Sequence, residues 1–91
     1  MLKDREIEKL FIKSCKYLNL TQDQIFLIPV KNEYLIVLLY LKLKSLLQNK
    51  NSCFLWLNSY NSHLKKTPSS MIFDAEQTIE LCDYISGFLS K

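Results

Sequence analysis

The side chains that could perform chemistry are few and scattered along this chain of 91 residues. The only histidine, His63, lies in a polar stretch beside Lys65 and Lys66. The single glycine excludes a glycine-rich phosphate loop, and no cysteine stands close to the histidine in sequence. A lone histidine in a polar loop is more often a surface residue than a base or a ligand. We therefore expect no catalytic residue, metal or cofactor, and a protein that is not an enzyme.

The cysteines and the chain start indicate the compartment. The three cysteines lie far apart, at Cys15, Cys53 and Cys82. Each falls on the apolar stripe of a predicted helix, which is typical of small core residues in a reducing compartment. Charged residues occupy the segment after Met1 where a signal peptide would be apolar. The apolar run Tyr34 to Leu41 is far shorter than the ~20 residues that span a bilayer. We expect a soluble, cytoplasmic protein without a membrane segment.

The basic side chains give a weak indication of nucleic-acid binding. The formal net charge is only +3. Four cations follow one stripe of the first predicted helix, namely Arg5, Lys9, Lys13 and Lys16. This row could meet phosphates or an acidic partner, but a charged row opposite an apolar one is also typical of any solvated helix face. We treat the row as a secondary candidate.

The composition predicts helices, because 48% of the residues are hydrophobic and there are only one glycine and two prolines. The predicted helical segments are Asp4 to Leu18, Thr21 to Ile28, Tyr34 to Leu47, a short helix around Trp56, a turn after Pro68, and Ala75 to Leu89. Thr21 with Gln24 has the spacing of a capping box, as has Asp74 with Gln77. Asn51 or Ser52 is the expected N-cap of the Trp56 helix. The sequence predicts an all-α, single-domain bundle of five to six helices around a central Leu-rich helix.

That central helix is apolar around nearly its whole circumference up to Leu41. Such a helix is either the centre of its own domain or shared with a second subunit, and we favour both. A chain of this size buries only somewhat more than ~60% of its unfolded surface, so a second copy would help it fold. We expect a homodimer.

The stretch from Cys53 to Ile72 predicts a corner, in which a short helix runs into a polar loop that Pro68 ends. Spacing puts Cys53, Trp56, Leu57 and Tyr60 on one stripe, so we expect Trp56 and Leu57 in the core. The last helix carries two apolar rows. Ala75, Ile79, Cys82, Ile85 and Leu89 form the row that we expect in the core, while Leu81, Tyr84 and Phe88 lie beside it. This second row indicates either an interface or a helix wedged between two neighbours.

Part of this pattern resembles a known family. Trp56-Leu57, Asn61, Leu64, Pro68, Met71-Ile72 and the helix from Ile79 to Ile85 are similar in order and spacing to the C-terminal toxin-binding domain of Xre/MbcA/ParS-type antitoxins. The segment Cys15 to Ile25 resembles the start of that family's N-terminal helix-turn-helix, whose recognition helix is missing after Ile28. The resemblance implies a truncated helix-turn-helix-like part at residues 1–30 and an antitoxin toxin-binding domain at 31–91, packed as one domain. Lys65-Lys66 stand where the family has glycines, and Gln77 where it has a glycine that opens the last helix.

The resemblance implies a homodimerising antitoxin that binds a RES-domain toxin, an NAD-consuming enzyme, and blocks its active site sterically. The partner contacts that it implies are Asn61, His63, Lys65, Lys66, Tyr84, Phe88, Leu89 and Lys91. Specific DNA recognition is not expected. Two alternatives remain from the sequence: a stand-alone dimeric interaction module without a toxin, and a DNA-binding regulator that uses the basic row.

Overall fold

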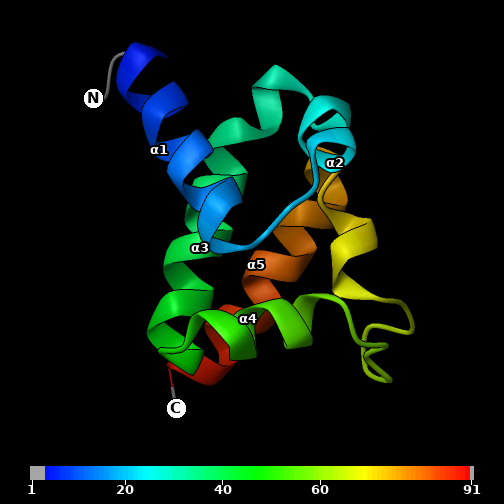
Figure 1. Ribbon diagram of the computed structural model, residues 1–91. Coiled ribbons are helices and arrows are strands. Elements are labelled where there is room, and N and C mark those ends of the chain that lie inside the picture. Colours follow the sequence, from blue (N-terminus) through cyan, green and yellow to red (C-terminus); the bar gives the residue numbers. More distant parts are fainter. Residues whose placement is uncertain (1–3, 91) are drawn as a thin grey trace.

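A computed structural model describes residues 4–90 and consists of five α-helices and two 3-10 turns in that range, which confirms the predicted all-α class. The elements are α1 (Asp4–Tyr17), α2 (Gln22–Leu27), η1 (Val30–Asn32), α3 (Glu33–Leu47), α4 (Lys50–Leu57), η2 (Pro68–Met71) and α5 (Ala75–Leu89). Figure 1 shows α1 and α5 alongside α3, with α4 crossing its lower end. No helix in the described range is long and apolar enough to cross a membrane.

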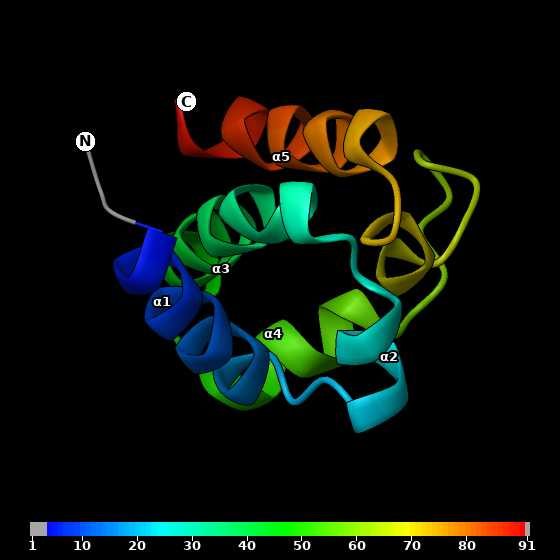
Figure 2. The ribbon, with the colours of Figure 1, turned by 90° about the horizontal axis from the view of Figure 1, so that it is seen from above.

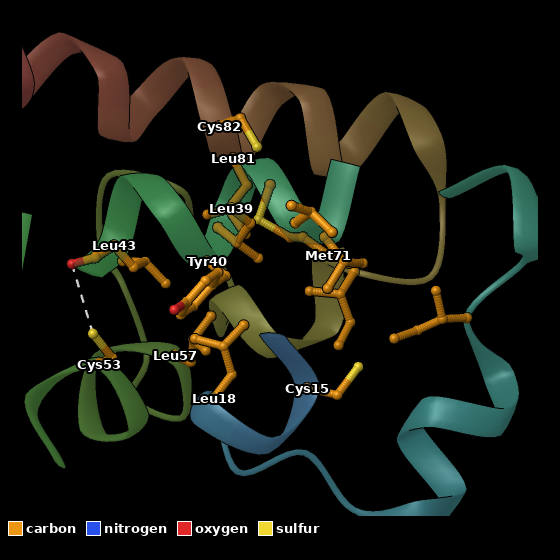
Figure 3. Packing of buried hydrophobic residues seen from close by; sticks show 14 of the residues in the cluster. Cys15, Leu18, Leu39, Tyr40, Leu43, Cys53, Leu57, Met71, Leu81 and Cys82 are labelled. Atoms are coloured by element: carbon orange, nitrogen blue, oxygen red, sulfur yellow. Dashed lines mark hydrogen bonds between the residues drawn. The ribbon is translucent and has the colours of Figure 1, made fainter. Parts of the chain in front are cut away.

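The central position of α3 agrees with its Leu-rich sequence. It packs against α5, α1 and α4, and seen from above it lies between α5 and the pair α1 and α4 (Figure 2). Ile36, Leu39 and Leu43 are fully buried along its inner face. Figure 3 shows Leu39 and Leu43 among Leu57, Met71 and Leu81, which come from α4, η2 and α5. Burying several such side chains, each worth roughly 1.5–3 kcal/mol, is what holds the helices together.

Local side-chain caps fix several helix starts. Thr21 and Gln24 form the predicted capping box of α2, with both reciprocal hydrogen bonds present. The Asp74 side chain accepts a hydrogen bond from the Gln77 N–H at the start of α5, as expected. The N-cap prediction for α4 was wrong, because Asn49 rather than Asn51 or Ser52 fills this role, accepting from the Ser52 N–H at 2.9 Å. Asparagine at 49 has the same capping capacity as at 51, so composition alone did not separate them.

The buried face of α5 differs from the predicted row. Cys82 and Ile85 are buried as expected, but Ile79 and Leu89 are exposed, whereas Leu81 and Thr78 are completely buried. The reason is that α5 packs on both α3 and η2, which moves its buried face toward the second row. Thr78 enters the core because its hydroxyl is satisfied, lying 2.8 Å from the Met71 carbonyl oxygen.

A buried asparagine connects the two halves of the chain. The Asn32 side-chain amide donates to the Ile72 carbonyl at 2.8 Å and to the Thr78 hydroxyl at 3.0 Å. Asn32 is completely buried where η1 enters α3, and no group among residues 4–90 donates a hydrogen bond to its Oδ1. Because buried polar groups are strongly unfavourable unless bonded, these two hydrogen bonds fix how η1 sits against the η2–α5 junction.

Candidate partner-binding site

Four aromatic rings from α4, the following loop and α5 meet at one corner of the molecule. We call Trp56, His63, Tyr84 and Phe88 the aromatic corner. Tyr84 is its centre: its ring centroid lies 6.4 Å from that of Trp56 in a stacked arrangement and 6.3 Å from that of His63. Phe88 meets Tyr84 edge to face at 5.1 Å. Trp56 and Tyr84 are half-buried while His63 and Phe88 are exposed, so the corner combines mutual packing with accessible ring surface.

Trp56 is therefore not the core residue that the sequence predicted. The helix α4 buries Cys53 and Leu57, which are four positions apart, and turns Trp56 to the side of that pair. Tyr60 is exposed because α4 ends at Leu57, so helical spacing no longer applies to it. The i, i+3, i+4, i+7 pattern thus included one residue that packs half-buried against the edge of the core, Trp56, and one that is exposed, Tyr60.

The loop between α4 and η2 forms a small hairpin that its own hydrogen bonds fix. The Asn61 Oδ1 accepts from the backbone N–H groups of His63 at 2.9 Å and Leu64 at 3.0 Å. Backbone bonds join Lys65 N to Asn61 O at 2.7 Å and Asn61 N to Lys66 O at 3.1 Å. Asn61 was predicted as a partner contact, and its acceptor oxygen serves the hairpin; an asparagine side chain that binds the backbone two residues on is typical of such turns.

The two lysines of the hairpin have different environments. Lys65 is exposed and has a φ of 60°, the left-handed conformation that glycine adopts most readily. Lys66 is half-buried, and its Nζ donates to the Gln77 Oε1 at 3.4 Å. The Gln77 side chain was predicted to complete the capping box of α5, but it accepts from Lys66 instead. Only the other half of the box is present, in which the Asp74 side chain accepts from the Gln77 N–H.

A shallow depression of ≈ 280 Å³ lies beside the aromatic corner. Its lining comes from the end of α4 and the hairpin, namely Trp56, Ser59, Tyr60, Asn61, Ser62 and His63. The aromatic corner therefore adjoins a concave surface lined by aromatic, hydroxyl and amide groups. Such a surface suits a protruding side chain of a protein partner.

The other predicted partner residues lie at the end of α5. Phe88 belongs to the corner, Leu89 is exposed one residue later, and Lys91 lies outside the described residues. The structure thus brings the hairpin residue His63 against Tyr84 of α5, which also contacts Phe88 one turn later, while Leu89 follows at the helix end. The sequence analysis did not name Trp56 and Tyr60 as partner contacts, although both line the depression. Two aromatic side chains at the end of a short helix were the feature that could have indicated them.

The basic row is separate from the corner. Arg5, Lys9, Lys13 and Lys16 are all exposed on α1, which packs on α3 and buries Phe11 and Cys15. In Figure 1 the exposed α1 helix lies at the upper left and the hairpin at the lower right. Two distinct surfaces therefore carry the two sets of predicted residues.

The three cysteine thiols are buried, and burial raises their pKa. Burial raises the pKa of Cys15 and of Cys82 to about 11, with Glu33 adding to the shift at Cys15, and burial also raises the pKa of Cys53. A thiol with a raised pKa carries little nucleophilic thiolate near neutral pH. Within residues 4–90 no three His, Cys, Asp or Glu side chains gather as a metal site would require.

Comparison of the chain with protein-family models, with curated proteins and with solved structures found no match.

Proposed function

We propose that this chain is an antitoxin-like protein that binds a partner toxin through the aromatic corner and neutralises it by covering its active site. One observation carries the proposal: four rings are held together at the surface by a hairpin and a helix end instead of filling the core. Rings in such a position give a large, stiff contact area with few rotatable bonds. Protein interfaces concentrate binding energy in residues of this kind.

The charges around the corner indicate the character of the partner surface. Lys65 is exposed and His63 is exposed beside it in the hairpin, while Lys66 lies half-buried against Gln77. Lysines at the edge of an aromatic patch favour an acidic rim on the partner and speed its approach. The rings would supply most of the binding affinity. The lysines would orient the partner and raise the rate of association.

The family resemblance supports one class of toxin within the proposal. The segments that resemble the antitoxin toxin-binding domain are those that build the corner: the Trp56-Leu57 pair, the hairpin and α5. A RES-domain toxin, which consumes NAD, is therefore the partner that we propose. Neutralisation would require only that the bound protein deny NAD access to the toxin, which needs no chemistry from this chain.

The test begins with the reading frame beside this chain, where the proposal expects a RES-domain toxin. Purified toxin is assayed for NAD consumption while the protein is titrated in, and the mixture is run on gel filtration. We expect NAD consumption to stop near stoichiometric addition and a complex to elute ahead of either component. Undiminished NAD consumption together with separate elution would remove the proposal.

Matched charge reversals locate the contact. Lys65→Glu changes an exposed lysine in the hairpin, and Lys13→Glu makes the same change on α1, at an equally exposed position far from the corner. We expect Lys65→Glu to weaken inhibition by roughly tenfold, as loss and reversal of one close charge pair typically does, and Lys13→Glu to leave inhibition unchanged. The opposite pattern would assign binding to the basic row instead.

A further inference from the structure

A cleft of ≈ 440 Å³ lies between the start of α1 and the junction of η1 with α3. We call it the α1–η1 cleft. Six residues line it, two from α1 and four from the η1–α3 junction: Ile7, Glu8, Val30, Lys31, Glu33 and Tyr34. Both walls belong to the upper end of the molecule in Figure 1, whereas the hairpin lies at the lower right. The cleft is therefore a surface separate from the aromatic corner.

The apolar part of the cleft consists of side chains that the fold leaves outside its core. Val30 is 80% exposed and Tyr34 is 54% exposed. Because η1 runs directly into α3, these two residues are one helical turn apart and share a side. Ile7, half-buried on α1, lines the same space. Single exposed apolar side chains are ordinary, but three that line one concave surface are typical of a binding surface.

The cleft also holds two carboxylates that repel each other. Burial and the nearby Glu8 carboxylate both raise the pKa of Glu33. Lys31 lines the same cleft, but a cation that dominated the surroundings of Glu33 would lower the pKa of this acid instead. Two acids and one base leave the cleft with a net charge of −1. A further cation at the two acids would remove their repulsion.

We propose that the α1–η1 cleft binds a basic segment of a protein partner, with an arginine at Glu8 and Glu33 and an apolar neighbour against Val30. Both parts of such a segment meet a complementary surface within one cleft. An arginine side chain has a hydrocarbon stem, which can cover the apolar wall while the charged head reaches the acids. Its guanidinium group also binds carboxylates through parallel hydrogen bonds, which fixes the orientation of the segment.

The charge of the cleft favours a protein partner over a membrane surface. Exposed apolar side chains hold proteins to bilayers best when lysine or arginine surrounds them, because cytoplasmic membrane surfaces are anionic. The acids Glu8 and Glu33 would be repelled by such a surface. The same acids attract a basic peptide and steer its approach.

The η1 wall of the cleft is fixed before any partner arrives. Asn32, within the lining segment, is completely buried and donates to the Ile72 carbonyl and the Thr78 hydroxyl. These hydrogen bonds hold η1 in place while Val30 stays exposed. A preformed wall loses little conformational entropy on binding. The inference does not rest on the proposed toxin binding, because it uses other residues.

The first test titrates isotope-labelled protein with a synthetic peptide and follows the backbone amides by NMR. The peptide has blocked ends and one arginine between two leucines. Its matched control has citrulline, which has the shape of arginine without the charge. We expect the arginine peptide to shift the amides of residues 7–8 and 30–34. It should bind about tenfold more tightly than the citrulline peptide, as one charge-assisted contact typically gives.

The second test removes the two acids together. In the double variant Glu8→Gln with Glu33→Gln, the two peptides should bind within about twofold of each other, because the charge that distinguishes them has no counterpart. The matched control is Glu76→Gln with Glu80→Gln, two exposed acids on α5, which should keep the tenfold preference. Circular dichroism verifies that both double variants remain folded.

The third test concerns the apolar wall. Val30→Ser should weaken both peptides by the same factor, since it removes apolar contact and no charge. The matched control is Phe26→Ser on α2, because Phe26 is 89% exposed and does not line the cleft. We expect Phe26→Ser to leave the binding of both peptides unchanged.

Five outcomes would overturn the proposal. Two concern the peptides: no amide shifts at millimolar arginine peptide, or equal binding of the arginine and citrulline peptides to the unmodified protein. The others assign the cleft to a different occupant. Tighter binding of spermidine at the same amides would indicate a free polyamine. Binding to anionic phospholipid vesicles that Val30→Ser removes would indicate a membrane, and shifts of these amides with protein concentration alone would indicate a second copy.

Discussion

The Asn32 amide donates a hydrogen bond of 3.0 Å to the Thr78 hydroxyl, across 46 positions of sequence and between two completely buried side chains. Thr78 Oγ1 also lies 2.8 Å from the carbonyl oxygens of Met71 and Asp74. Asn32, Thr78 and the end of η2 thus form one polar network inside the core. Such networks specify a unique arrangement only while their members keep their partners.

Asn32→Ala should lower the free energy of unfolding by about 1–3 kcal/mol, because it leaves the Ile72 carbonyl and one side of the Thr78 hydroxyl buried without a donor. Urea denaturation followed by circular dichroism measures the change. Asn58→Ala is the matched control, since Asn58 also donates to a carbonyl but is exposed. The double change with Thr78→Val should be less than additive. Equal effects of Asn32→Ala and Asn58→Ala would contradict this account.

The two neighbours Leu57 and Trp56 should respond differently to truncation. Leu57 is fully buried, so Leu57→Ala should lower the free energy of unfolding by about 2–5 kcal/mol. Trp56 is half-buried against Tyr84, so Trp56→Ala should destabilise less while removing one wall of the corner. Chemical denaturation of both variants tests the order, and a larger loss for Trp56→Ala would return this side chain to the core.

Lys65→Gly should stabilise the protein by roughly 1 kcal/mol, because lysine at a φ of 60° is strained where glycine is not. Thermal melting measures the gain. Lys50→Gly, at the first position of α4, provides a control for loss of a lysine charge without relief of backbone strain. If toxin binding depends on the Lys65 charge, Lys65→Gly should melt higher and bind less. A lower melting temperature would show that the side chain stabilises the hairpin more than its backbone strains it.

The buried cysteines should make stability fall at alkaline pH. Burial raises the pKa of Cys15 and Cys82 to about 11 from the 9.0 of an ordinary thiol. Below pH 9 both the folded and the unfolded thiols are protonated, so their contribution is fully present. Between pH 9 and 11 the unfolded chain loses these protons first, and the folded state loses stability. Urea titrations at pH 8 and pH 10 measure this; replacing Cys15 and Cys82 by alanine should flatten the dependence, and an unchanged slope would assign it to other groups.

Thiol labelling gives an independent reading of the same burial. At pH 7.5 an aromatic disulfide reagent should react with the three cysteines only as fast as the protein opens, because all three are buried and protonated. Addition of denaturant should release all three at once. Fast reaction of one thiol in the folded protein would show that its helix opens locally.

The basic row on α1 predicts only weak, sequence-independent affinity for duplex DNA. Four exposed cations can displace at most about four counterions, so the slope of log K against log salt should not exceed about 3.6 in magnitude. Fluorescence anisotropy between 50 and 200 mM salt measures the slope, and Lys9→Glu with Lys13→Glu should abolish binding. High affinity that persists at 200 mM salt and discriminates sequences would contradict the expectation that specific recognition is absent.

Most of the fold was predictable because helix signals are local. The apolar period of α1, the capping box at Thr21 and the Asp74 cap each depend on residues within one or two turns, and each agreed with the structure. The buried face of α5 was not predictable from the sequence, because it depends on the directions from which η2 and α3 pack against the helix. Thr78 is the clearest case: the predicted core row left out this polar residue, and its hydroxyl is satisfied in the core by the Met71 and Asp74 carbonyls and by the distant Asn32 amide.

The candidate site was predictable in its parts and not in its assembly. The i, i+4 spacing of Tyr84 and Phe88 indicated that these two rings are neighbours, but nothing in the sequence indicated that the loop residue His63 meets Tyr84. Trp56 was assigned to the core because it shares a helix face with Cys53 and Leu57. Helix periodicity shows which residues share a face, but it does not show how deeply each of them is buried. The role of Asn61 within the hairpin likewise depends on a turn that the sequence suggested only by its polar composition.

The hairpin from Asn61 to Lys66 has a consequence for the kinetics of recognition. Its shape is maintained by bonds from the Asn61 side chain and backbone, so the ordering entropy of this segment is lost when the chain folds and not when a partner arrives. A surface already in its bound shape needs no slow rearrangement after collision. Association through the aromatic corner should therefore be limited by encounter and orientation, with a single kinetic phase whose rate rises linearly with partner concentration.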